Sequence, residues 1–147
     1  MATYTKVNDW LEYLVEDVNL STDTFRIALS NTAPASEMSN PLDEGNGVLA
    51  NVTEIDYTNY SDTNTVDRQL DNTQSELISG VLVFSADSFV IEADGGALPE
   101  FRYIYAYDDS VTGDPLVALW DIGFGVSLDD GDDISIDFGS SGIFTVQ

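Results

Sequence analysis

The sequence contains no cysteine and no histidine, and only four of its 147 residues are basic, with Lys6 the single lysine. Without cysteine, the chain can form neither disulfides nor thiolate metal sites. Without histidine, it lacks the commonest general base and the commonest neutral metal ligand. No basic stretch followed by an apolar run opens the sequence, so we expect no signal peptide. No apolar run approaches the roughly 20 residues that a membrane span needs.

Acidic residues dominate the charge. The chain carries 27 of them, and its net charge is −23. A surface with this charge repels phosphate groups, which argues against direct binding to nucleic acid or to an anionic membrane. Two explanations of the acidity stay open. The chain is either an ordinary acidic protein or one made for a saline environment, where salt screens the repulsion between carboxylates.

Length and aromatic content indicate one folded domain over residues 1–147. Seven tyrosines, seven phenylalanines and two tryptophans are far more than a disordered acidic segment carries. The N-terminal part predicts an amphipathic helix over about residues 6–18, because its apolar residues recur at the spacing of one helix face. These residues are Val7, Trp10, Leu11, Leu14, Val15 and Val18.

Everything after this helix has the pattern of β-structure. Eight short segments alternate or run apolar, and glycine, asparagine and aspartate turn signals separate them. They cover residues 24–29, 48–55, 77–85, 88–93, 101–107, 116–122, 134–138 and 143–147. The pattern predicts a mainly β fold, an antiparallel β-sandwich or jelly-roll-like barrel over about residues 23–147, with the helix packed on it.

The strand expected at 101–107 carries a tyrosine row. Tyr103, Tyr105 and Tyr107 share one side, and the opposite side is also largely apolar. Such a row forms either a core face or a platform on which sugars stack, and we favour the core. Two apolar faces place the strand in the middle of a sheet or at a subunit interface, so Tyr103 and Tyr105 are interface candidates.

Residues 56–76 form a polar excursion between expected strands. Their few apolar or aromatic positions cannot make a core of their own. The segment is therefore either a long loop or an arm that orders on a partner. Its interface candidates are Tyr57, Tyr60, Arg68 and Leu70.

The densest group of carboxylates lies around Gly131. It consists of Asp129, Asp130, Asp132 and Asp133. An EF-hand loop needs a glutamate at its twelfth position, which is absent here, so the four residues are weak calcium candidates and no metal site is predicted. Aspartate and glycine favour tight turns, and we therefore predict a hairpin turn between two strands.

No pattern indicates an enzyme. A pair of carboxylates can hydrolyse glycosides, and Asp121, which follows Trp120 on an apolar strand, is the one position we nominate. Its alternative role, which we favour, is a hydrogen bond to a neighbouring turn. No glycine-rich phosphate loop or nucleophile elbow occurs. We expect no catalytic residue and no cofactor.

Three stretches together resemble the small virion structural proteins of tailed double-stranded-DNA phages. The N-terminal helix pattern leads into Leu29–Pro34, "LSNTAP", and then into Val48–Ile55, "VLANVTEI". The run from 101 to 138 resembles that family's aromatic strand, Asp-Pro-Leu and Trp-Asp motifs, acidic glycine turn and closing strand. The resemblance covers about residues 5–55 and 77–146.

The resemblance implies a non-enzymatic structural protein, foremost a capsid decoration or cement protein on the outer surface of a phage head. A tail or head-fibre protein is the alternative, and the tyrosine row leaves a carbohydrate-binding module as a second one. The implied partners are the major capsid protein and other copies of the chain. We expect a homotrimer, because icosahedral shells present local threefold positions.

Overall fold

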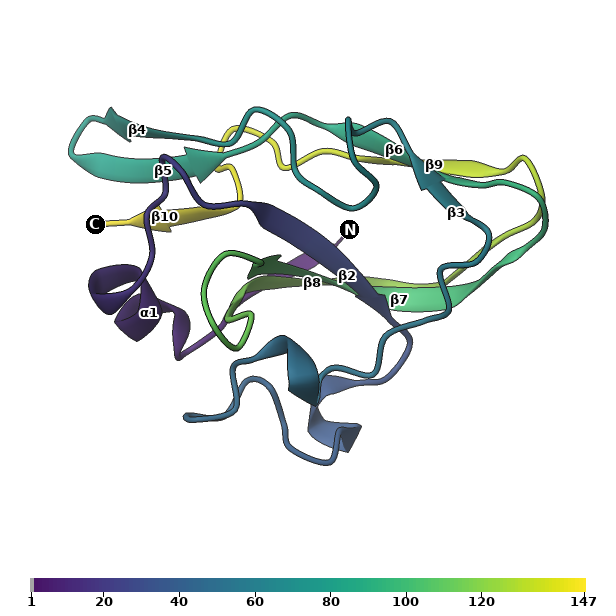
Figure 1. Ribbon diagram of the computed structural model, residues 1–147, viewed down its shortest axis with the longest axis horizontal. Helices are drawn as coiled ribbons and strands as arrows, with labels where there is room; N and C mark the ends of the chain where they lie inside the picture. Colours follow the sequence, from purple (N-terminus) through teal and green to yellow (C-terminus); the bar gives the residue numbers. More distant parts are fainter. Residues whose placement is uncertain (1) are drawn as a thin grey trace.

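The computed structural model describes residues 2–147 and shows a mainly β fold with one short α-helix (Figure 1). The elements are β1 (Thr3–Lys6), α1 (Trp10–Glu16), β2 (Phe25–Ser30), η1 (Pro34–Ser36), η2 (Leu49–Asn51), β3 (Tyr60–Asp62), β4 (Gln74–Ile78), β5 (Val81–Ser85), β6 (Phe89–Ala93), β7 (Leu98–Asp108), β8 (Leu116–Leu128), β9 (Asp133–Ile136) and β10 (Phe144–Val146). All strand pairs are antiparallel. The predicted β-sandwich class is thereby confirmed.

The strands form two layers. One layer is a four-stranded sheet in the order β1-β8-β7-β2. The other consists of two three-stranded sheets, β10-β5-β4 and β3-β6-β9, which lie end to end above it (Figure 1). An aromatic contact joins the layers: the ring centroids of Phe25 in β2 and Phe84 in β5 are 4.7 Å apart. Within the upper layer, Phe84 stacks on Phe144 of β10 at 5.1 Å. The main core therefore lies between the layers.

The tyrosine row lies on the other face of the four-stranded sheet. Tyr103, Tyr105 and Tyr107 are all buried, in β7 at the centre of that sheet. The irregular segment 31–55 covers this face in Figure 1, and the amide of Ile55 donates to the carbonyl of Leu29 in β2. The strand is central, as predicted from its two apolar faces, and its rings are not free to stack on a sugar.

The N-terminus differs from the prediction of one helix over residues 6–18. Residues 3–6 instead form β1, which pairs with Ala118–Asp121 of β8. The helix covers only Trp10–Glu16, and Trp10 alone among its residues is buried, whereas Val15 is 78% exposed. Of the apolar residues expected on one helix face, Val7 and Trp10 are buried, whereas Leu11 and Val15 are exposed. The backbone N–H and C=O groups of residues 3–6 are hydrogen-bonded to β8 instead of within a helix. The helix therefore begins only after this strand.

Two predicted strands are wrong. Residues 48–55 contain the single 3₁₀ turn η2 and no ladder strand, although Val48 makes an isolated bridge to Pro115. Residues 77–85 are not one strand but parts of two, because the chain reverses at Ser79 and Gly80, both with positive φ. That backbone conformation matches the type I′ turn of a two-residue β-hairpin.

The polar excursion is integrated into the fold. Tyr60 and Leu70 are buried, and residues 60–62 form β3 against β6. The carbonyl of Arg68 accepts the amide of Ile27, and the amide of Leu70 donates to Phe25. The segment thus covers the outer edge of β2, so within the chain it is a packed loop and not a free arm. No helix in residues 2–147 is long and apolar enough to cross a membrane.

Candidate interaction surface

The acidic turn connects the two layers. It leads from β8 in the four-stranded sheet to β9, which pairs with β6 in the other layer and not with β8. The predicted hairpin is therefore wrong, although the prediction of a turn holds. A local aspartate–glycine pattern specifies that the chain turns but not which strand the next segment joins, because that choice depends on distant partners.

The aspartates of this turn have structural contacts. Asp130 Oδ1 accepts the amides of Gly95 and Gly96 at 2.9 and 3.2 Å. Asp132 Oδ2 accepts the amide of Asp129 at 3.2 Å. All four calcium candidates, Asp133 included, are exposed. Across residues 2–147, no group of three or more Asp or Glu side chains is placed to hold a metal ion.

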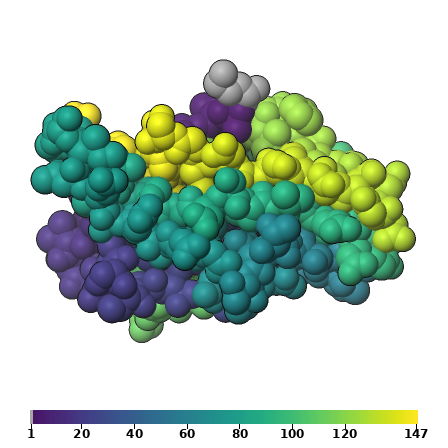
Figure 2. Space-filling view, turned by 90° about the horizontal axis from the view of Figure 1, so that it is seen from above, coloured from purple at the N-terminus to yellow at the C-terminus, as the bar shows by residue number. Residues whose placement is uncertain are grey.

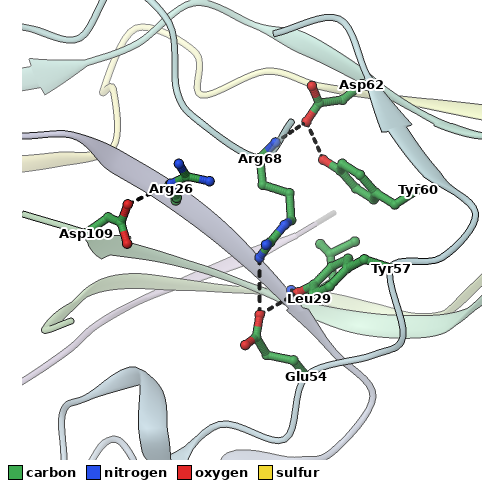
Figure 3. Close-up of polar contacts among 8 residues, drawn as sticks. All are labelled: Arg26, Leu29, Glu54, Tyr57, Tyr60, Asp62, Arg68 and Asp109. Carbon is green, nitrogen blue, oxygen red and sulfur yellow. Dashed lines mark hydrogen bonds and ion pairs between the residues drawn. The ribbon is translucent and has the colours of Figure 1, made fainter. Parts of the chain in front are cut away.

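Arg68 organises a polar cluster at the edge of β2 (Figure 3). Its guanidinium carbon lies 4.1 Å from the ring centroid of Tyr57, and its Nη1 lies 3.4 Å from Glu54 Oε1. The Tyr57 hydroxyl donates to the same Glu54 oxygen at 2.8 Å and accepts the amide of Leu29 at 2.8 Å. Burial raises the pKa of Tyr57 well above its usual value. These groups satisfy one another within the chain.

The remaining interface candidates also lie inside the fold. The Tyr60 hydroxyl donates to Asp62, which also accepts the backbone amide of Arg68 at 2.8 Å. Leu70, Tyr103 and Tyr105 are buried. One chain thus leaves little of Tyr60, Leu70, Tyr103 or Tyr105 for a partner to contact.

Asp121, the nominated carboxylate, forms a two-bond ion pair across strands β7 and β8. Its oxygens accept Arg102 Nε at 2.7 Å and Nη2 at 2.9 Å. The hydrogen bonds from Arg102 lower the pKa of Asp121, and the amide of Gly123 donates to it at 2.8 Å. A carboxylate held ionised in this way is not suited to act as a general acid. Both partners of Asp121 lie within strands, Arg102 in β7 and Gly123 in β8, so the expected hydrogen bond to a neighbouring turn is replaced by an ion pair between strands.

All three arginines have acidic partners. Arg26 Nε lies 2.9 Å from Asp109 Oδ2 (Figure 3), and the other two pair as described above. Among residues 2–147, Lys6 is the one basic side chain without an ion pair, and it is exposed on β1. The described surface therefore offers no cluster of free cations to a phosphate group.

The β4–β5 hairpin is the main apolar feature that the chain leaves uncovered. Every residue of β4 is exposed, and Leu77 and Ile78 at its end are 71% and 48% exposed. Residues 73–86, which contain the hairpin, hold one charged residue, Glu76. The hairpin stands at one end of the molecule (teal in Figures 1 and 2).

Both faces of the hairpin carry apolar side chains near its tip. Leu77 lies opposite Leu82, on the face that carries the buried Phe84 farther along. Ile78 lies opposite Val81, on the outer face. A strand pair that covers a core usually has one polar face. Exposed apolar side chains on both faces are instead typical of a segment that another surface buries.

A groove runs beside β1. It has a volume of about 730 Å³ and lies between Tyr4 and Trp120 on one side and the C-terminal residues 137–145 on the other. The ring centroid of Trp120 is 6.0 Å from that of Tyr4 and 5.3 Å from that of Phe138. The three rings are tilted by 55° and 49°, so they do not form the flat platform on which a sugar ring would stack.

The N-terminal segment lies next to the C-terminal segment in Figure 2, purple beside yellow at the upper edge. Residues 138–147 contain no charged side chain. The hairpin, the groove and this segment thus form a weakly charged part of an otherwise strongly acidic surface. The charge distribution along the sequence could have indicated it, since residues 73–86 and 138–147 stand out from the acid-rich segments around them. The hairpin itself could not be predicted, because residues 77–85 were expected to form one strand without the turn at Ser79 and Gly80.

Comparisons with protein-family models, with curated proteins and with solved structures find no match to this chain.

Proposed function

We propose that this chain is a non-enzymatic virion structural protein of a tailed phage that decorates and stabilises the head. The family resemblance of its sequence suggests the class of particle. The observation that carries the proposal of an assembly role is the tip of the hairpin, where Leu77 and Ile78 point to opposite faces and are not covered within the chain. Burying each side chain fully on a partner would contribute about 1.5–3 kcal/mol.

The charge distribution supports a protein that binds at one region and repels elsewhere. With a net charge of −23, most of its surface opposes close approach by other acidic surfaces. The weakly charged region can meet a partner without this repulsion. On a shell that presents many equivalent sites, modest contacts per copy are multiplied when the copies are themselves joined.

The alternative is a tail or head-fibre protein, which requires the same kind of surface at a different place on the particle. A census of purified virions by quantitative mass spectrometry separates the two. Hundreds of copies per particle would support the head, and a few to tens would support the tail or a fibre. Absence of the chain from purified virions would overturn the proposal.

Binding to shells tests the head assignment directly. We expect the purified protein to co-sediment with shells that lack it and to raise the temperature at which they open. The double variant Leu77→Ser/Ile78→Ser should bind less. The matched control, Met38→Ser, replaces another exposed apolar residue outside the hairpin and should bind as the native chain does. Sedimentation of the native protein with isolated tails and not with shells would favour the alternative.

A further inference from the structure

Two edge strands, β1 and β4, have outer edges without partners. β1 pairs only with β8, and β4 pairs only with β5. No other backbone hydrogen bond within residues 2–147 reaches Thr3–Lys6 or Gln74–Ile78 from their outer sides. The edge of β2, by contrast, is covered by Arg68 and Leu70. Unpaired edges are templates for adding a strand from another chain.

The residues on these two edges complement each other. Tyr4 and Lys6 share one face of β1, and Tyr4 also lines the groove. Glu76 and Ile78 share one face of β4, because alternate residues of a strand point the same way. Each strand therefore carries one charged and one apolar residue two positions apart. In an antiparallel pair, Lys6 opposite Glu76 places Tyr4 opposite Ile78.

We propose that β4 of one copy adds antiparallel to β1 of a second copy, with Glu76 facing Lys6 and Ile78 facing Tyr4. This inference rests on the proposed assembly role and names a second copy as the partner of the hairpin. Lys6 is the one basic side chain of the described residues without an ion pair, and Glu76 is the only charged residue of the hairpin segment. The contact thus joins opposite charges between two chains that otherwise repel.

The groove supplies the apolar part of the contact. Tyr4, 44% exposed, lies at its rim beside Trp120. In the proposed register, Ile78 of the second copy lies opposite Tyr4, on the face of β1 that borders the groove. Leu77 lies opposite Thr5, on the other face. The hairpin of the second copy then covers rings that one chain leaves open.

The contact is heterologous, because each copy offers β4 on one side and β1 on the other. Such contacts close into rings when the rotation between copies allows it, and otherwise continue as open chains. A closed ring agrees with the small cyclic oligomer expected from the sequence.

A charge exchange tests the pairing in the purified full-length protein. Lys6→Glu and Glu76→Lys should each weaken self-association about 10-fold or more in sedimentation velocity, since attraction becomes repulsion. The double variant Lys6→Glu/Glu76→Lys has the native net charge and should recover most of the association. Glu92→Lys, which changes an exposed charge on β6, is the matched control for Glu76→Lys and should not weaken it. Thermal unfolding checks that each variant is folded.

Cross-linking tests the register. The sequence contains no cysteine, so Tyr4→Cys protein mixed with Ile78→Cys protein can form a disulfide only between copies. Directly opposite residues of antiparallel strands are about 4.5–5.5 Å apart at Cα, within disulfide range. We expect covalent dimers from this mixture and few from Tyr4→Cys mixed with Val66→Cys, another exposed position.

A native protein that stays monomeric, a double charge variant that does not recover association, or equal cross-linking of both mixtures would overturn the inference. Each result comes from the isolated protein. None depends on whether the chain occurs in virions, so failure of the strand pairing and failure of the proposed function are distinguished.

Discussion

The ring of Trp10 lies edge-on to the ring of Phe144, with centroids 5.5 Å apart and planes at 73°. Trp10 belongs to α1, and Phe144 belongs to β10 near the other end of the sequence. Trp10 also contacts Phe25 edge-on, at 6.3 Å. One side chain thus attaches the helix to both layers of the sandwich.

Trp10→Ala should therefore lower the free energy of unfolding by about 3–5 kcal/mol, the usual cost of removing a buried aromatic side chain. Urea denaturation followed by circular dichroism measures the change. Val15→Ala on the same helix is the control, because Val15 is 78% exposed and should cost less than about 0.5 kcal/mol. A small effect of Trp10→Ala would mean that the helix is not needed for packing.

Stability should depend on monovalent salt more than on calcium. Salt screens the repulsion among all the carboxylates, and it should raise the midpoint of thermal unfolding steadily. Asp130 already accepts the amides of Gly95 and Gly96, so millimolar calcium should add little. A large, saturable calcium shift that Asp130→Ala/Asp132→Ala abolishes would contradict this interpretation of the turn.

Because of Asp108, the protein should be more stable in mild acid than at neutral pH. Its side chain is buried, and burial together with the neighbouring Asp23 raises its pKa to about 6. The folded state therefore takes up a proton between about pH 4 and 6 that the unfolded state does not hold, so this contribution to stability falls as the pH rises to about 6 and is constant above it.

Asp108→Asn should accordingly stabilise the protein by about 1 kcal/mol or more at pH 7.5, with the gain shrinking toward pH 4. Thermal unfolding at a series of pH values measures the difference. Asp109→Asn, one position along, removes the same charge from a partner of Arg26 and should not give this gain. A gain for Asp108→Asn that does not change with pH would contradict the assignment.

Arg68 has a φ of 65°, a left-handed conformation that strains residues with a Cβ. Arg68→Ala keeps this strain and loses the contacts with Tyr57 and Glu54. Arg68→Gly loses the same contacts and relieves the strain, so we expect it to be more stable than Arg68→Ala by about 0.5–1 kcal/mol. Denaturant titration of the two variants tests this order. The reverse order would show that the backbone at Arg68 is not strained.

The sequence alone determined the fold class and most of the strands. Alternation at residues 24–29, 101–107 and 116–122 marks side chains that must leave water, and this signal is local. The two apolar faces of 101–107 placed β7 in the middle of a sheet, where the structure has it. The composition likewise determined the acidic surface and the scarcity of free basic groups.

The tertiary structure decided the pairing of the strands and the exposure of their residues. Residues 3–6 became β1 because β8 offers them backbone partners, and the acidic turn joins different sheets because β9 finds β6. Backbone hydrogen bonds between distant segments leave little trace in local composition. The same holds for the candidate surface: the sequence shows that residues 73–86 are apolar and weakly charged, but only the folded chain shows that nothing within it covers Leu77 and Ile78.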